Sequence, residues 1–242
     1  MDVFHILKNR TGVELEHPLI SDLHRHLVIN ADFTAAEKVL QTAYQRNVYK
    51  PYLDSVKYTP IWRQIQASNE DGEAPCARGG HQMCIDVQGR MIYILGGWDG
   101  KQDLSDFWSY DIRENRWSLL SMDTQMQGGP SPRSCHKICF DPISRSIFVL
   151  GRYVESPPNS GQTLESDFYR YYIEFDQWVK INENTSNAGG PELIYDHQMC
   201  VDPEGEALYV FGGRTVTGDT NIQNYSGFYS FSIKTNQWEL VR

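Results

Sequence analysis

The sequence predicts a mainly β protein in which three propeller-type blades, too few to close a ring, follow an α-helical segment. Composition is the first indication, because 12 % aromatic residues, 22 % charged residues and 19 glycines suit strands and turns better than a helical bundle. Apolar residues at helical spacing between residues 17 and 46 are the second. The third is a motif of four parts that occurs three times after residue 76, as in propeller blades of four strands each.

The helical segment is predicted to span residues 1–66 and to contain an antiparallel pair of helices. The first helix lies within residues 17–30, with an apolar face formed by Leu19, Ile20, Leu23 and Leu27. The second begins at a capping box, Thr34 to Glu37, and has an apolar stripe at Phe33, Ala36, Leu40 and Ala43. A short link through Asn30 and Ala31 joins them. The pair is either a hairpin packed on the rest of the chain or a docking module with Leu19, Leu23, Leu27 and Leu40 as binding residues.

The repeat follows a polar linker predicted at residues 67–75. Each repeat opens with His-x-x-Cys-x-Asp, at His81, His136 and His197. An apolar strand then ends in small residues, at Gly96-Gly97, Gly151-Arg152 and Gly212-Gly213. An aromatic strand follows (DFWSYDI, DFYRYYI, GFYSFSI), and each repeat closes at a tryptophan, Trp117, Trp178 or Trp238. The blades are therefore predicted at residues 76–130, 131–188 and 189–242.

The His-x-x-Cys spacing suggests a metal site, but a strand does not support one. Residues three apart in a strand point to opposite faces, so His81 and Cys84 cannot bind the same ion. A ring of the three histidines around a central channel is the weaker alternative. Structural zinc needs four ligands close together, and the repeating strand pattern already explains these residues. We therefore predict no metal and no other cofactor.

Two further sets of recurring residues have structural explanations. The aspartates that end the His-x-x-Cys-x-Asp units are followed by turn residues, which predicts hairpin turns rather than catalytic carboxylates: Asp86, Asp141 and Asp202. The three closing tryptophans are predicted to pack between blades.

The segments that join the second and third strands are the best candidates for recognition. They span 98–105, 152–166 and 214–227, and loops in equivalent places project from the same face of a propeller. Trp98 and Asp99 are favoured because an aromatic side chain in a glycine-flanked turn is costly to expose. Arg152 and Arg214 hold related positions in the other repeats. The alternative is that the loops are solvated connectors.

The repeat resembles the kelch repeat in its double glycine, its spaced aromatic residue and its closing tryptophan. The helical segment HPLISDLHRHLVINADFTAAEKVLQTA resembles a CTLH segment, and VFHILKNRTG, residues 3–12, resembles the end of a LisH motif. A CTLH segment leading into ARGGHQM, GGWDG, SDFWSYD and RSCHK resembles the muskelin family. Gly151-Arg152 departs from the double glycine, and residues 192–196 lack the arginine that precedes the other two histidines.

Charge and segment composition exclude several classes of protein. The net charge is −9, and residues 67–242 hold 24 acidic against 14 basic side chains, which disfavours nucleic acid as a partner. No apolar run is long enough for a signal peptide or a membrane span, so we expect no membrane association and a cytoplasmic or nuclear location. Three blades cannot close a ring that typically has four to eight, so we expect a piece of a larger protein, or self-association through uncovered end blades.

The resemblance implies a protein–protein interaction scaffold that has no catalytic activity of its own. It would be a muskelin-like subunit of a CTLH/GID ubiquitin ligase, which binds other subunits through its helices and partners through its kelch loops. The alternative is an enzyme that uses the propeller channel, such as a copper-dependent oxidase. No motif position presents a nucleophile, a base and an orienting group together, which favours the scaffold.

Overall fold

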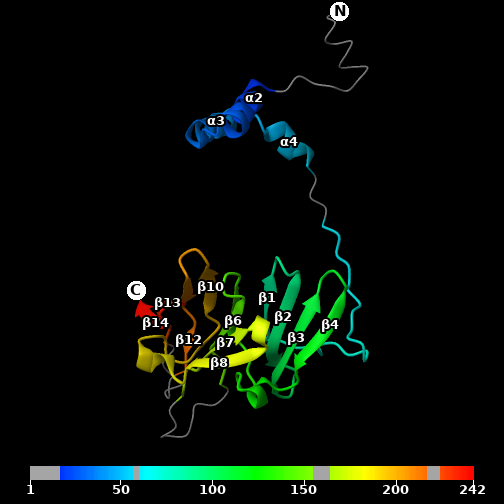
Figure 1. Ribbon diagram of the computed structural model, residues 1–242, viewed down its shortest axis with the longest axis vertical. Coiled ribbons are helices and arrows are strands. Elements are labelled where there is room, and N and C mark those ends of the chain that lie inside the picture. Colours follow the sequence, from blue (N-terminus) through cyan, green and yellow to red (C-terminus); the bar gives the residue numbers. More distant parts are fainter. Residues whose placement is uncertain (1–16, 57–59, 155–163, 217–223) are drawn as a thin grey trace, which may run out of the picture. The chain divides into compact units, whose positions relative to one another are not determined.

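The computed structural model of the protein describes residues 17–56, 60–154, 164–216 and 224–242. The chain divides into a helical unit, Met1–Gln64, and a sheet unit, Ile65–Arg242 (Figure 1). The segment that resembles the end of a LisH motif, residues 3–12, lies outside the described residues. No helix in the described ranges is long and apolar enough to cross a membrane.

The helical unit contains the predicted pair of helices and a further short helix. Its elements are α2 (Pro18–His24), a π-helical turn η1 (Arg25–Ile29), α3 (Phe33–Gln45) and α4 (Lys50–Ser55). The predicted capping box at Thr34 is wrong, because Asp32 caps α3 and its carboxylate accepts a hydrogen bond from the Ala35 amide at 2.9 Å. The short helix α4 was not predicted, although Pro51 suits a first turn.

The apolar stripe predicted on α3 is only partly buried. Ala36 and Ala43 are buried, whereas Phe33 is exposed and Leu40 is 42 % exposed. On the first helix, Leu19 and Leu23 are half-buried and Leu27 is 40 % exposed. The small alanines let the helices approach closely, and the larger apolar side chains around them remain on the surface.

The sheet unit consists of three antiparallel four-stranded sheets in chain order (Figure 1). The first sheet contains β1 (Gln82–Asp86), β2 (Met91–Trp98), β3 (Asp103–Asp111) and β4 (Arg116–Ser121). The second contains β5 (Lys137–Asp141), β6 (Ser146–Leu150), β7 (Phe168–Tyr172) and β8 (Gln177–Asn182). The third contains β10 (Gln198–Asp202), β11 (Ala207–Phe211), β13 (Phe228–Ser232) and β14 (Gln237–Leu240).

Shorter elements connect these strands. A two-stranded pair joins β9 (Ile194–Tyr195) to β12 (Arg214–Thr215), and 3₁₀ turns η2 (Thr124–Gln127), η3 (Ile173–Phe175) and η4 (Thr185–Ala188) lie between or within the sheets. The segment predicted as a linker at residues 67–75 is held on the first sheet. The amide of Trp117 donates to the Ser68 carbonyl at 3.2 Å, and Arg116 forms a 2.9 Å ion pair with Glu70.

Consecutive sheets pack through alternate side chains of their strands. In β6, Ile147 and Val149 join the core shared with the first sheet, whereas Phe148 and Leu150 join the core shared with the third. Trp178 packs on Phe107 of the first sheet with ring centroids 5.4 Å apart. The strand β6 is therefore apolar on both faces, which explains why polar and apolar residues do not alternate in it.

Glycine at the end of each second strand allows the next sheet to approach. Gly96 and Gly151 have φ angles of 57° and 81°, in the left-handed region. A Cβ atom on Gly151 would lie 2.4 Å from the Ile194 carbonyl oxygen and 2.7 Å from the His197 ring. A Cβ atom on Gly96 would likewise lie 2.7 Å from the Arg133 oxygen. No side chain fits at these two positions.

Backbone hydrogen bonds cross both junctions at the same place in the repeat. The Gly97 amide donates to the Arg133 carbonyl at 2.9 Å, and the Arg152 amide donates to the Ile194 carbonyl at 3.1 Å. The residues just before the three histidines are also joined from repeat to repeat. The Cys135 amide donates to the Gly80 carbonyl at 2.8 Å, and the Asp196 amide donates to the Cys135 carbonyl at 3.2 Å. The sheets are thus joined by directional bonds as well as by apolar packing.

The outer face of the third sheet repeats the composition of the two buried junctions. Phe211 is 64 % exposed, although Leu150 and Leu95 at the same repeat position are buried. Gly212, which corresponds to Gly96 and Gly151, has nothing within 4 Å of its Cβ position. The expectation of self-association through an uncovered end sheet rests on this face and stays a prediction.

The closing tryptophans do not all behave as predicted. Trp178 and Trp238 are buried between sheets, in the two shared cores. Trp117 is only half-buried, and it packs on Trp108 and Tyr110 of its own sheet, with centroids 6.5 and 5.0 Å away. The prediction of packing between sheets is wrong for Trp117, because no described sheet lies on that side of it.

The first strands begin one residue later than predicted. Each histidine precedes its strand, because the residue before it is left-handed: φ is 61° at Gly80, 56° at Cys135 and 55° at Asp196. The aspartates at the strand ends form turns as predicted, with Asp86 accepting from the Gly89 amide at 2.9 Å and Asp202 from the Gly205 amide at 3.1 Å. Asp86 also forms a 2.8 Å ion pair with Arg145 of the second sheet.

The junction glycines provide a matched pair of variants. Gly151→Ala adds left-handed strain and a clash with the next sheet, whereas Gly212→Ala adds only the strain. We expect a cost of about 1–2 kcal/mol for Gly212→Ala and roughly 1–3 kcal/mol more for Gly151→Ala, measured by denaturant unfolding of the full chain. Equal costs for the two variants would contradict the junction geometry.

The buried histidines predict a loss of stability in mild acid. Burial, and then the charge of Lys137, lowers the pKa of His197 to about 3, and burial followed by the charge of Arg133 also lowers the pKa of His136. The unfolded chain binds these protons near pH 6.5, so the contribution of the two histidines to stability is constant well above that pH and falls as the pH drops through it. We expect a loss of roughly 2 kcal/mol per histidine between pH 6.5 and 5.

Denaturant unfolding at several pH values measures this loss. His197→Gln should flatten the pH dependence, even if it lowers the stability at pH 7. His24→Gln, which removes an exposed histidine of the helical unit, should leave the dependence as it is. A wild-type stability that does not change over this range would show that the buried histidines take up protons in the folded state.

Candidate functional site

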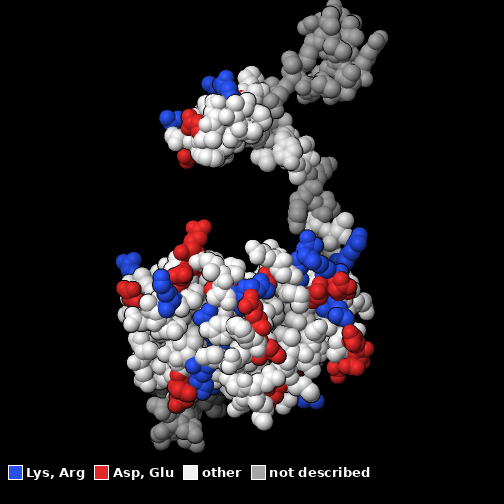
Figure 2. All heavy atoms as spheres, in the orientation of Figure 1, with Lys and Arg blue, Asp and Glu red and all other residues white. Residues whose placement is uncertain are grey.

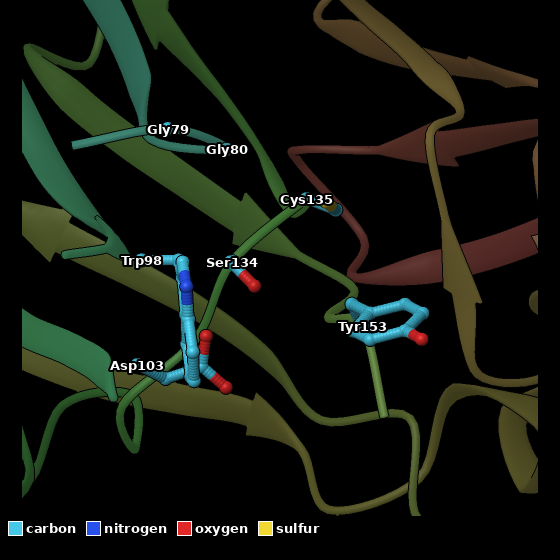
Figure 3. A pocket seen from close by; sticks show the side chains of 7 residues that line it. All are labelled: Gly79, Gly80, Trp98, Asp103, Ser134, Cys135 and Tyr153. Carbon is cyan, nitrogen blue, oxygen red and sulfur yellow. The ribbon is translucent and has the colours of Figure 1, made fainter. Parts of the chain in front are cut away.

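A pocket of about 510 Å³ lies between the first and second sheets, on the face where the second and third strands are joined (Figure 3). Its volume is in the range of typical ligand sites. Trp98 and Tyr153 stand on opposite sides of it, and both are about two-fifths exposed. The remaining lining residues are Gly79, Gly80, Asp103, Ser134 and Cys135.

Small residues create this space. Trp98 and Tyr153 hold the same position in successive repeats, each directly after the two junction residues. Between the second and third sheets, the place of Ser134 is taken by Tyr195, whose ring packs edge-on against Tyr153 with centroids 5.2 Å apart. The first junction has only the hydroxymethyl group of Ser134 there, so the space between its aromatic walls stays open.

A buried ion pair fixes the segment that carries Ser134 and Cys135. Arg133 donates to both carboxylate oxygens of Asp167, at 3.0 and 2.9 Å, and also to the Ser131 carbonyl at 2.9 Å. Burial opposes ionisation of Asp167, but the charge and hydrogen bonds of Arg133 outweigh it and lower the pKa of that carboxyl. Arg78 and Asp106 form the corresponding pair in the first sheet, at 2.5 and 2.7 Å.

The third repeat replaces both members of this pair. Ile194 stands where the other repeats have arginine, and Gly227 stands where they have aspartate. Ile194 is buried in the second shared core. A buried charge without its partner is costly, so the simultaneous change of both residues is what the electrostatics require.

Cys135 is a poor nucleophile in this setting. Burial, and then the charge of Asp196, raises the pKa of its thiol, and Asp103 adds to this effect. The thiolate that acts as a nucleophile or metal ligand is therefore disfavoured. Within the described ranges, no three His, Cys, Asp or Glu side chains are close enough together to hold a metal ion.

Asp103 is the acidic group of the pocket. It pairs across the strands with Trp98, and its carboxylate lies beside the indole (Figure 3). Its Oδ1 is buried and has no hydrogen-bond partner among the described residues. This differs from Asp106 and Asp167, whose charges arginines neutralise.

The structure separates the two candidates favoured in the first loop. Trp98 lines the pocket, whereas Asp99 does not. The Asp99 carboxylate accepts hydrogen bonds from the Lys101 and Gln102 amides at 2.7 and 2.9 Å, and these bonds lower its pKa. Asp99 therefore shapes the turn between β2 and β3.

The two arginine candidates already have partners within the chain. Arg152 donates to the Ser131 hydroxyl at 3.2 Å and lies 3.7 Å from the Asp167 carboxylate. Arg214 holds the repeat position of Trp98 and Tyr153, and its hydrogen bond to Tyr195 raises its pKa. The other candidates, Leu19, Leu23, Leu27 and Leu40, belong to the helical unit.

Asp103 and Tyr153 lie inside the loops predicted for recognition, 98–105 and 152–166, but they were not singled out there, and Ser134 was not predicted at all. A signal for Tyr153 was present, because aligning the repeats on their junction residues places it at the position of Trp98. Most of the loop that follows it lies outside the described residues, as do residues 217–223 of the third loop.

These features define a class of protein: a β-propeller whose four-stranded sheets follow one another along the chain. The family model of the attractin/LZTR1 β-propeller matches residues 46–242. The chain therefore belongs to the attractin/LZTR1 β-propeller family.

Curated relatives agree with a kelch-type propeller. The chain is 33 % identical over 168 residues to Mei4-dependent protein 6 of Schizosaccharomyces pombe, covering 67 % of this chain and 23 % of that protein. It is 23 % identical over 186 residues to Kelch domain-containing protein 10 of Homo sapiens and of Bos taurus, covering 76 % of this chain and 37 % of each relative. The chain thus spans only about a quarter to a third of the length of these relatives.

The arginine–aspartate pair next to the pocket can be tested by exchanging it for the residues of the third repeat. Arg133→Ile leaves the buried Asp167 charge with only Arg152, 3.7 Å away, and should cost about 3 kcal/mol. Adding Asp167→Gly should restore part of this loss, so that the double variant unfolds at higher denaturant than Arg133→Ile alone. If the cost of the double variant equals the sum of the costs of Arg133→Ile and Asp167→Gly measured separately, the pair is not coupled.

Proposed function

We propose that the protein is a non-catalytic interaction scaffold whose sheet unit binds a protein partner at the pocket between Trp98 and Tyr153. The observation that carries this proposal is an open space walled by two half-exposed aromatic side chains on a rigid pair of sheets. Exposed aromatic residues around a preformed hollow are typical of binding hot spots. A propeller of kelch type is consistent with a role in protein interaction.

The charge distribution suits a protein partner better than a nucleic acid. Acidic and basic side chains are interspersed over the face of the sheet unit seen in Figure 2, and that face shows no extended basic patch. The net charge of the chain, −9, points the same way. Phosphate binding would need clustered lysines and arginines, whereas Arg78, Arg133 and Arg145 are each paired with an aspartate.

We further propose that the helical unit is an assembly module of CTLH type. The support is the resemblance of residues 17–43 to a CTLH segment and the exposed apolar side chains of the unit. Besides Leu27 and Leu40, these are Val28, Ile29, Phe33, Tyr44, Tyr52, Leu53 and Val56. Together with the kelch repeats, this favours a muskelin-like subunit of a CTLH/GID ubiquitin ligase that scaffolds the ligase or presents partners to it.

An enzyme that uses the propeller channel is the competing proposal. The raised pKa of Cys135 and the ion pairs of the neighbouring arginines leave the pocket without an activated nucleophile. Mass spectrometry of the purified protein for bound metal separates the two proposals. Copper or zinc at one ion per chain would favour the enzyme.

Two surface variants test the division of labour between the units. Leu27→Asp changes an exposed side chain of the helical unit, and Trp98→Ala changes a wall of the pocket. The full chain is used as bait in affinity capture followed by mass spectrometry. With Leu27→Asp, the amount of captured ligase subunits should fall at least about tenfold. Trp98→Ala should keep those subunits and lose a different partner. Lys101→Ala, in the turn beside Trp98, is the matched control. If both test variants retain every partner, the proposal is wrong.

A further inference from the structure

The geometry points to a specific ligand for the pocket: a basic side chain, arginine or lysine, of the partner protein, held between Trp98 and Tyr153 and paired with Asp103. This inference rests on the proposed function and gives the chemistry of its contact. Three observations support it: the aromatic walls of the pocket, the Asp103 carboxylate without an ion-pair partner in the described ranges, and Arg214 at the equivalent position of the third repeat.

The pocket has the surfaces that a long cationic side chain needs. Trp98 and Tyr153 present aromatic surface on opposite sides, and Figure 3 shows the Asp103 carboxylate beside the Trp98 ring. Aromatic surfaces attract cations through their negative faces, and tryptophan does so most strongly. The methylene groups of arginine or lysine would lie against the same walls.

The negative charge in the pocket has no counterion in the described part of the chain. Asp103 makes no ion pair there, and its Oδ1 has no donor. The nearby arginines are occupied, Arg78 by Asp106 and Arg133 by Asp167. A cation from outside would therefore be attracted to the pocket.

The next junction shows that this position accepts an arginine. Arg214, which is exposed, holds the repeat position of Trp98 and Tyr153 and pairs across the strands with Tyr195. A side-chain hydrogen bond to Tyr195 raises the pKa of Arg214. Between the second and third sheets, the chain thus supplies its own cation beside an aromatic ring. At the pocket between the first and second sheets, this repeat position is held by Trp98 and Tyr153, so a cation there must come from a partner.

An acidic or purely apolar ligand fits less well. A carboxylate would face the like charge of Asp103, and an apolar side chain would bury that charge further. Both are outcomes of the test described next.

The test measures binding of a blocked peptide, acetyl-Ser-Gly-Arg-Gly-Ser amide, to the full chain by the NMR shift of the Trp98 indole N–H. A Trp98→Phe variant assigns that signal. We expect a saturable shift with a Kd of about 1–10 mM. The lysine peptide should also bind. Peptides with citrulline, norleucine or glutamate in place of arginine should bind at least about tenfold more weakly. Citrulline keeps the shape of arginine and lacks its charge, so equal binding of the citrulline peptide would overturn the inference.

Two variants locate the contact. Asp103→Asn keeps the size of the side chain, removes its charge and should weaken binding of the arginine peptide about tenfold. Asp99→Asn removes the same charge four residues away, preserves the acceptor oxygen of the turn, and should leave binding unchanged. If both variants weaken binding equally, the contact is general electrostatic attraction and the inference fails.

The outcome also separates this inference from the proposed function. The comparison of arginine and citrulline peptides uses the unaltered protein, so it gives a result even if Asp103→Asn does not fold. Absence of peptide binding, together with a partner that is lost in Trp98→Ala, would leave the interaction role and remove the basic ligand. If the arginine peptide does not bind and Trp98→Ala retains every partner, both the basic ligand and the proposed interaction role are wrong.

Discussion

The structure of the sheet unit depends on the close approach of each sheet to the glycine that ends the second strand of the sheet before it. At Gly96 and Gly151, the carbonyl oxygen of the next sheet occupies the space that a Cβ atom would need. The same approach brings the Gly97 and Arg152 amides within hydrogen-bonding distance of that sheet and buries His136 and His197 at the junctions. The apolar packing between sheets and the burial that lowers the pKa of these histidines go together with this contact.

The candidate site is a local variation on this repeated junction. Equivalent backbone hydrogen bonds cross both junctions. Between the second and third sheets Tyr195 packs on Tyr153, whereas between the first and second sheets Ser134 is at the equivalent position and the pocket stays open. A rigid framework with one changed residue is an economical way to obtain a pocket, because the walls are already fixed by the packing of the sheets.

Much of the fold could be predicted from the sequence, because the repeat gives several independent signals for each strand. The helix pair, the class of sheet, the turn role of Asp86 and the position of the loops followed from spacing and turn chemistry. The start of β5 and the cap of α3 did not. Cys135, two residues before β5, and Ala31, directly before the cap residue Asp32, are in the left-handed region, and their side chains do not identify that conformation in a sequence.

The site was less predictable than the fold. Trp98 was identified from its unusual place in a turn, but Asp103 and Ser134 are ordinary residues whose importance comes from neighbours in the next sheet. The same limit applies to Asp99, Arg152 and Arg214, which were plausible as exposed polar groups. The structure places them in a turn, beside an ion pair and in a hydrogen bond to a tyrosine, respectively. Contacts across a junction are not encoded by spacing within one repeat.

Hydrogen exchange at three equivalent amides tests the junction most directly. The Gly97 and Arg152 amides donate across the junctions, whereas the Gly213 amide, at the same repeat position, has no acceptor among the described residues. The account predicts that Gly97 and Arg152 exchange only when the sheet unit unfolds and that Gly213 exchanges far faster. Rapid exchange at Gly97 and Arg152, at the rate of Gly213, would show that the sheets are not held together by this contact.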